Sequence, residues 1–384
     1  MFDPISISGM ELKNRFMRSA TYDGMAKDGQ VTEIQIELYR KLAQGGAGLI
    51  VSGLMSVSKD GRLSPFQNHV FEDAHVEGLG KLTEAVHQAG GKVAVQLAHA
   101  GRESFVLHHS EDGDLPAGPS AQEKGPGYEG RCRALSAEEI ASIVQSFGRA
   151  AGLAKQAGFD AVQLHAAHAY LLAQFLSPLS NRREDEWGGP LSGRLRLHLQ
   201  ILKAMREQVG GDYPLMIKLG MADGAPGGLE LAEGLEAASK LAEAGFDCLE
   251  ISQGLRGSTW NEMEFKTKLT PGRQNYFAQW AAQVKERVDQ PVVMVGGLRS
   301  YNSIAESLRR DDADLAALCR PLIREPDLVL RWQKDAAYKP KCISCNQCLL
   351  LLRGGRALAC AQDDQAAREY IKRIKQKEKD PDHE

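Results

Sequence analysis

The chain has 384 residues, of which 43% are hydrophobic and 25% are charged, a composition typical of a globular protein with a packed core. Its 47 Lys and Arg residues nearly balance its 50 Asp and Glu residues, and the net charge of -3 argues against a dedicated nucleic-acid-binding protein. No run of about 18 apolar residues predicts a membrane span. The first residues also lack the basic start and apolar stretch of a secretory signal. We therefore expect a cytoplasmic protein with neither a membrane nor a nucleic acid as partner.

Short β-branched or apolar segments alternate along the chain with amphipathic helical patterns. Eight of them are candidate strands, at residues 15–20, 47–54, 92–97, 160–165, 215–220, 248–252, 291–296 and 313–319. The clearest helical pattern covers 136–156 and opens with Ser136 and Glu139 at the spacing of a capping box. Eight strand–helix units predict an α/β fold, a (β/α)8 TIM barrel over residues 1–337, rather than an open doubly wound sheet.

Two regions depart from this alternation. Residues 103–134 are rich in Gly, Pro, His and charge, and we expect a long loop there, after the third strand, where barrels commonly build substrate sites. Residues 338–384 form a short extension that holds four of the seven cysteines. Its last segment, 371–384, is almost all charged and is expected to be a frayed helix or a disordered tail.

Polar side chains are predicted to face the barrel axis near the ends of three strands. Alternation along 92–97, 160–165 and 215–220 places the apolar residues on one face and leaves Gln96, Gln163, His165 and Lys218 inward. A buried polar group without a partner costs about 1–3 kcal/mol. Each residue alone could be a satisfied core residue, but the convergence of Gln96, His165 and Lys218 on one mouth predicts a ligand site.

His165 is followed by His168 and Tyr170 where the fourth strand ends. Two imidazoles and a phenol can bind a carbonyl oxygen and supply a proton. The histidines could instead hold a metal ion together with a carboxylate, or all three could be packing and capping groups. No carboxylate stands beside them at a clear metal-binding spacing, which counts against the metal alternative.

A candidate phosphate site follows the last two predicted strands. Gly296 and Gly297 come after the seventh strand, and Arg320 follows Cys319 at the end of the eighth. Loops after strands seven and eight are where TIM barrels commonly bind phosphate, and glycines let backbone N–H groups approach it.

Taken together, these segments resemble the old yellow enzyme family of FMN-dependent NADH:flavin oxidoreductases. The matching segments cover residues 1–335 in the order found in the family: LKNRF at 12–16, GGAGLI at 45–50, QLAHAGR at 96–102, HAAHAYL at 165–171, QFLSP at 174–178, NRR at 181–183, DEWGG at 185–189, RP at 320–321 and REPD at 324–327. No single segment is specific, but the set is.

The resemblance implies FMN at the barrel mouth and assigns a role to each candidate. Ser19, Ala20 and Thr21 would line the flavin, Gln96 and Lys218 would bind its pyrimidine edge, Gly296, Gly297, Cys319 and Arg320 would hold its phosphate, His165 and His168 would bind the substrate carbonyl, and Tyr170 would donate a proton. The implied chemistry is hydride transfer from NAD(P)H to FMN and then to the β-carbon of an activated alkene.

Four positions depart from common family patterns. Lys218 stands where Arg is frequent, which keeps the charge but loses the forked donor. Ala169 and Cys319 each stand where Gly is usual, and Tyr22 stands where some relatives have a redox-tuning Cys. These departures concern the substrate range and the flavin potential more than the fold.

The cysteines of the extension have the pattern C-x2-C-x2-C-x11-C, formed by Cys342, Cys345, Cys348 and Cys360. Three close thiolates and a remote one are more typical of iron–sulfur ligation than of zinc, which usually takes two separated pairs. The pattern resembles that of the larger relatives trimethylamine dehydrogenase and 2,4-dienoyl-CoA reductase, without their C-terminal domains. It favours a [4Fe–4S] cluster, with zinc and metal-free thiols as alternatives.

Three functions remain open from the sequence. The first is an FMN-dependent ene-reductase acting on enones or enoyl thioesters, with electrons from NAD(P)H or from the cluster. The second is a flavin-free, metal-dependent barrel lyase or hydrolase with His165 and His168 as ligands. The third is a flavin and iron–sulfur electron-transfer subunit that serves a partner enzyme. The expected partners are a small unsaturated carbonyl compound, with an electron-donor protein and a homo-oligomer left open.

Overall fold

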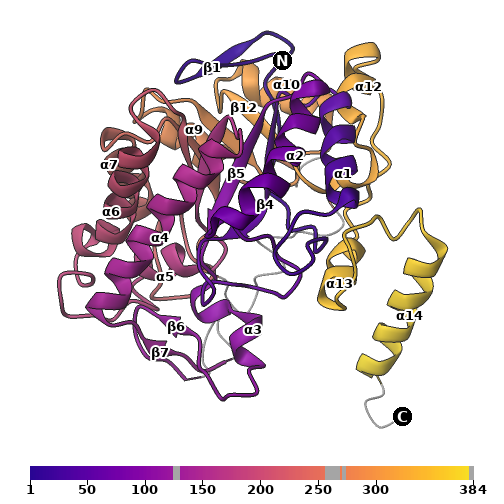
Figure 1. Ribbon diagram of the computed structural model, residues 1–384. Helices are drawn as coiled ribbons and strands as arrows, with labels where there is room; N and C mark the ends of the chain where they lie inside the picture. The colour runs from indigo at the N-terminus through magenta and orange to yellow at the C-terminus, as the bar shows by residue number, and fades with distance from the viewer. Residues whose placement is uncertain (124–129, 256–268, 270–273, 380–384) are drawn as a thin grey trace.

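The structure is a computed structural model, and it describes residues 1–123, 130–255, 269 and 274–379. Eight parallel strands close into a barrel (Figure 1). In order around the barrel they are β3 (Phe16–Arg18), β4 (Leu49–Ser56), β5 (Val93–Ala98), β8 (Ala161–Ala166), β9 (Leu215–Gly220), β10 (Cys248–Ser252), β11 (Val292–Val295) and β12 (Leu315–Leu318). Each overlaps a predicted strand, which confirms the TIM barrel.

Helices connect the strands and cover the outside of the barrel. They are α1 (Glu33–Gln44), η1 (Asp73–His75), α2 (Val76–Gln88), α4 (Ala137–Gln156), α5 (Leu171–Leu176), α6 (Leu191–Val209), α7 (Leu231–Glu243), α9 (Ala278–Lys285), α10 (Tyr301–Arg309), α11 (Arg320–Arg324) and α12 (Leu328–Lys334). The predicted capping box is confirmed, because Glu139 N donates to Ser136 Oγ at 3.2 Å and Ser136 N donates to Glu139 Oε2 at 2.8 Å.

The predicted loop after the third strand contains short elements. The described part of this region begins in η2 (Gly101–Glu103) and continues with α3 (Phe105–His108), β6 (Ala117–Gly118) and β7 (Arg133–Ala134). The strands β6 and β7 pair in parallel, which brings the middle of the segment beside its C-terminal end.

The alternation of side chains separates two apolar layers. Val95 and Leu97 of β5 belong to the large cluster between strands and helices, whereas Ala94 belongs to a second cluster inside the barrel. Ala161 and Met216 occupy the same inner cluster, which the antiparallel hairpin of β1 (Ile5–Ile7) and β2 (Met10–Leu12) helps to form. The inner layer near the N-terminal ends of the strands is therefore apolar, and polar side chains begin one layer further along.

The extension packs against the barrel beside the segment that follows β3. Its helices α13 (Gln347–Arg353) and α14 (Gln365–Lys379) lie outside the ring of barrel helices (Figure 1). They pack together through Leu351, Ala361, Ala367 and Ile371. Leu358 N donates to Asp23 O at 2.7 Å, which ties the extension to the barrel. The helical alternative for the charged tail is confirmed as far as Lys379. None of the helices in the described ranges is both long enough and apolar enough to cross a membrane.

Candidate active site

Five polar side chains form one hydrogen-bonded chain across the barrel, above the apolar inner layer. Lys218 Nζ donates to Ser19 Oγ at 2.8 Å and lies 3.0 Å from Glu250 Oε1. Ser19 Oγ donates to the same carboxylate oxygen at 2.7 Å, and Gln163 Nε2 donates to Glu250 Oε2 at 2.9 Å. Gln96 Nε2 donates to Gln163 Oε1 at 2.7 Å. The structure therefore brings together Gln96 and Lys218, which the sequence predicted to converge.

Glu250 was not among the predicted site residues. It lies in β10 between Leu249 and Ile251, both of which pack toward the helices. The same alternation that identified Lys218 could have identified Glu250. The side chain of Glu250 is 0% exposed and that of Lys218 is 2% exposed. Because water reaches neither group, each charge is stabilised mainly by the other.

A pocket of about 620 Å³, open to solvent, lies at the C-terminal ends of the strands. Eight residues predicted for the site line it: Ser19, Ala20, His168, Lys218, Gly296, Gly297, Cys319 and Arg320. They come from segments of the chain that are far apart in sequence. Four other predicted residues, Thr21, Gln96, His165 and Tyr170, lie beside the pocket rather than on its wall.

The four residues beside the pocket contact the ones that line it or the polar chain. Thr21 Oγ1 lies 3.2 Å from Cys319 Sγ, and Gln96 belongs to the polar chain. The ring of His165 makes edge contacts with those of His168 and Tyr170, at centroid distances of 5.2 and 4.9 Å. The two imidazoles and the phenol thus form one group at the end of β8, as predicted.

The loop after β8 holds this group in an unusual backbone conformation. His168 and Ala169 have φ angles of 60° and 65°, a left-handed region that costs a non-glycine residue about 1–2 kcal/mol. The loop is held by hydrogen bonds from His168 N to Gln253 O at 3.0 Å and from Ala169 N to Gly254 O at 3.1 Å. The φ angle of Ala169 explains why Gly suits that position. His168 Nε2 lies 2.7 Å from Ser252 Oγ, which orients the ring.

Tyr22 packs beside Tyr170 of the same group. Its ring joins a small apolar cluster with Leu54 and Tyr170, and its hydroxyl lies 2.6 Å from Ser64 Oγ. Burial raises the pKa of Tyr22 to about 12, so the phenol stays neutral at physiological pH. Tyr22 therefore contributes a neutral phenol beside Tyr170.

Another part of the pocket lining has the properties of an anion site. Gly296 and Gly297 have φ angles of 103° and 74°. A Cβ at either residue would come within 2.6 or 2.7 Å of the Tyr276 ring, so only glycine fits. Arg299, which the sequence analysis missed, lines the pocket beside Arg320. Its Nε is buried and makes no hydrogen bond within the described residues, as expected of a donor that awaits an anion.

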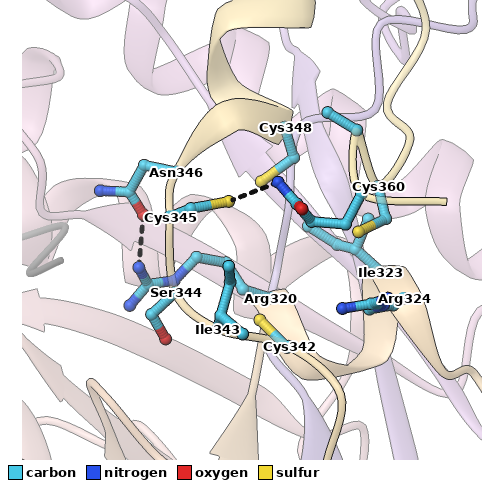
Figure 2. Close-up of a pocket in the computed structure, with 12 residues that line it drawn as sticks. Arg320, Ile323, Arg324, Cys342, Ile343, Ser344, Cys345, Asn346, Cys348 and Cys360 are labelled. Atoms are coloured by element: carbon cyan, nitrogen blue, oxygen red, sulfur yellow. Dashed lines mark hydrogen bonds between the residues drawn. The ribbon is translucent and has the colours of Figure 1, made fainter. Parts of the chain in front are cut away.

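The four cysteines of the extension line a second pocket, of about 330 Å³. Figure 2 shows Cys342, Cys345, Cys348 and Cys360 arranged around it. Gln362 Nε2 lies 3.7 Å from Cys345 Sγ. Among the described residues, no group of three or more His, Cys, Asp or Glu side chains is placed to hold one metal ion. The same finding counts against the metal-dependent lyase or hydrolase that would use His165 and His168.

Burial governs the thiols of this pocket. It raises the pKa of Cys348 to about 12 and also raises the pKa values of Cys342 and Cys360. Thiols in such surroundings stay protonated until a metal displaces the protons.

The two pockets share part of one wall. Arg320 and Ser344 line both, and Arg320 Nη1 donates to Asn346 Oδ1 in the cysteine loop. Ser344 Oγ is buried without a hydrogen bond in the part of the chain that the structure describes. The predicted phosphate arginine thus also belongs to the cysteine pocket.

Comparisons with known proteins agree with the fold. The model of the NADH:flavin oxidoreductase / NADH oxidase family matches residues 1–338. The NADPH dehydrogenase of Bacillus subtilis (strain 168) is 35% identical over 332 residues, which cover 85% of this chain and 92% of that protein. The NADH oxidase of Thermoanaerobacter brockii is 34% identical over 387 residues, which cover 97% of this chain and 57% of that protein.

A solved structure extends the similarity to nearly the whole chain. The complex of 2-naphthoyl-CoA reductase with 2-naphthoyl-CoA superimposes with a TM-score of 0.86 at 28% identity, covering 96% of this chain and 57% of that one. This chain therefore spans little more than half the length of the two relatives that match it almost throughout.

Proposed function

We propose that this chain reduces activated C=C bonds of small unsaturated carbonyl compounds. The chain belongs to the NADH:flavin oxidoreductase / NADH oxidase family and is an NAD(P)H-dependent flavin oxidoreductase. The observation that carries the proposal is the 620 Å³ pocket, whose lining combines Lys218 and Ser19 with Arg299, Arg320 and the two glycines. A mononucleotide with an apolar ring system and one phosphate matches that distribution of donors.

The residues present fit FMN, and each would have a distinct task. Bound FMN would supply hydride transfer between the nicotinamide and the substrate. Arg299 and Arg320 would hold its phosphate, and the Lys218 ammonium would stabilise negative charge at the polar layer. Gln96, Ser19, Ala20, Thr21, Gly296, Gly297 and Cys319 would complete the binding site.

The group at the end of β8 would act on the substrate. His165 and His168 would donate hydrogen bonds to a carbonyl oxygen and so polarise the conjugated double bond. Tyr170, whose ring adjoins that of His165, would deliver a proton through its phenol O–H. Enones and enoyl thioesters share the carbonyl that this arrangement recognises.

One experiment tests the proposal directly. The purified protein is assayed for bound flavin, for anaerobic bleaching of its ~450 nm band by NADH or NADPH, and for reduction of 2-cyclohexen-1-one and crotonyl-CoA. We expect FMN, bleaching by a nicotinamide, and turnover of at least one alkene. A colourless protein that cannot be reconstituted with FMN would rule the proposal out.

The histidines can be tested apart from turnover. In the variant His165→Ala/His168→Ala, phenols should no longer give a long-wavelength charge-transfer band, while FMN stays bound. Phenol titrations that match those of the wild type would remove both histidines from the substrate site. Ser303→Ala, on the outer helix α10, is the matched control and should titrate normally.

We also infer that residues 338–384 form a separate unit that carries a [4Fe–4S] cluster on Cys342, Cys345, Cys348 and Cys360. Zinc holds thiolates at about 2.3 Å and therefore draws four sulfurs close together. The cysteines that line this pocket have the C-x2-C-x2-C-x11-C spacing, which is more typical of iron–sulfur ligation than of the two separated pairs usual for zinc. The four cysteines match an iron–sulfur cluster in the number of ligands and in their thiolate chemistry.

The cluster test uses matched cysteine variants. Cys345→Ser should lose most of the iron and sulfide of anaerobically purified protein and retain most of the flavin. Cys132→Ser, a buried cysteine near β7, should keep both at wild-type levels. Full iron content in Cys345→Ser would contradict the assignment.

A second candidate function rests on the wall shared by the two pockets. Arg320 and Ser344 place the cysteine pocket next to the FMN pocket, which supports electron delivery through a cluster by a donor protein. If NADH and NADPH both fail to bleach the flavin while dithionite succeeds, the chain is an electron-transfer subunit of a partner enzyme. We retain a cytoplasmic location as part of the proposal, since free thiols and iron–sulfur ligands suit a reducing compartment.

A further inference from the structure

Glu250 is a fully buried carboxylate in contact with two residues that line the FMN pocket. Its Oε1 receives a hydrogen bond from Ser19 Oγ at 2.7 Å and lies 3.0 Å from Lys218 Nζ. Its Oε2 receives one from Gln163 Nε2 at 2.9 Å. Both oxygens are thus occupied by donors, the arrangement that suits a charged, acceptor-only carboxylate.

The charge of Glu250 opposes that of Lys218 at close range. A cation beside a flavin stabilises the reduced form when that form is an anion. A carboxylate 3.0 Å behind the cation, with both groups withdrawn from water, cancels much of this stabilisation. The pair is nearly neutral as a unit, so the flavin should be harder to reduce than it would be above an unpaired lysine.

Glu250 also determines how the amides of the polar chain point. Because Glu250 can only accept, Gln163 must turn its NH2 group toward it and its carbonyl oxygen toward Gln96. Gln96 must then donate to that oxygen at 2.7 Å. A glutamine at position 250 could donate to Gln163 and reverse both amides.

We propose that Glu250 is a positioning residue that lowers the reduction potential of FMN by neutralising Lys218 and that orients Gln96 through Gln163. The proposal rests on the proposed function, because it requires FMN in the pocket. Glu250 acts through Lys218, Ser19 and Gln163, and it needs no contact of its own with the flavin.

The test measures the FMN midpoint potential of purified, FMN-loaded protein by equilibration with a reference dye. Glu250→Gln should favour reduction at least tenfold, a rise of about 30 mV for a two-electron couple. Lys218→Met should shift the potential the opposite way, because it leaves the carboxylate alone. Gln163→Leu should weaken FMN binding, because it removes the acceptor of Gln96 Nε2 as well as the donor to Glu250 Oε2.

Two further variants keep the test decisive. Asp160→Asn removes a carboxylate that pairs with Lys92 at the N-terminal end of β8, far along the barrel axis, and should not change the potential. The double variant Lys218→Met/Glu250→Met buries no unpaired charge and remains informative if Glu250→Gln fails to fold. Its potential should lie between those of Lys218→Met and the wild type.

The results distinguish a failure of the role of Glu250 from a failure of the proposed function. Equal potentials in Glu250→Gln and the wild type, or a double variant below Lys218→Met, would overturn the role of Glu250. Wild-type protein that takes up no FMN would instead refute the proposed function itself.

Discussion

Replacing Lys218 by Met should destabilise the protein even without FMN, because it leaves Glu250 buried and unpaired. The two side chains are 2% and 0% exposed, so water cannot take over the role of the ammonium. Removing one partner of a buried ion pair typically costs about 3–5 kcal/mol. Unfolding entropy of about 2.1 cal/mol/K per residue gives about 0.8 kcal/mol/K for 384 residues. The melting temperature of the apoprotein should therefore fall by about 4–6 °C.

The assay is differential scanning calorimetry of apoprotein at neutral pH, with two comparisons. The double variant Lys218→Met/Glu250→Met should recover most of the loss, because replacing both charges by apolar groups leaves no buried charge alone. Lys81→Met removes the lysine of an exposed pair with Glu77 at a similar distance, 2.8 Å, and should not change the melting temperature measurably. If Lys218→Met has the melting temperature of the wild type, the electrostatic reasoning about this pair is wrong.

Two other perturbations follow from the structure. Gly297→Ala should weaken FMN binding at least tenfold in a fluorescence titration, because φ is 74° and the new Cβ would lie 2.7 Å from the Tyr276 ring. Burial raises the pKa of Asp23 from 3.8 to about 6, so its ionisation should lower stability as the pH rises from about 4 to 6, by up to about 3 kcal/mol. Asp23→Asn should remove that loss in pH-dependent unfolding, because its Oδ1 can still accept from Met25 N and Gln35 Nε2.

Each of these has a control and a contrary result. Gly210→Ala places a Cβ at a similar φ of 84° in open space after α6, so it should cost stability without affecting FMN affinity. FMN titrations that coincide for Gly297→Ala and the wild type would refute the close approach to Tyr276. A stability difference between wild type and Asp23→Asn that is the same at pH 4 and pH 8 would show that Asp23 does not titrate in this range.

Much of the site could be predicted from local patterns. The apolar residues that flank Gln96, His165 and Lys218 placed these side chains on the inner face of their strands, and the structure confirms that orientation. The spacing of His165, His168 and Tyr170 likewise predicted a group at one strand end, which the ring contacts confirm. These inferences succeeded because the side of a strand on which a residue lies depends on its neighbours alone.

Alternation along single strands does not predict which inward residues contact one another. Glu250 obeys the same alternation as Lys218, yet its significance lies in a 3.0 Å contact that depends on how β9 and β10 are aligned. Arg299 looks like any loop arginine in the sequence, and its buried Nε is recognisable only beside the pocket. Asp23 offers no local signal either, because its burial arises from distant segments that pack around it.

The sequence alone determined the eight strands, the inward side of Gln96, His165 and Lys218 and the four-cysteine pattern, because these depend on periodicity and spacing within single segments. Only the tertiary structure decided that Lys218 faces Glu250 and that Arg320 and Ser344 belong to both pockets. The physical reason is barrel closure: the stagger of neighbouring strands and the packing of the extension bring together residues that are far apart in the chain.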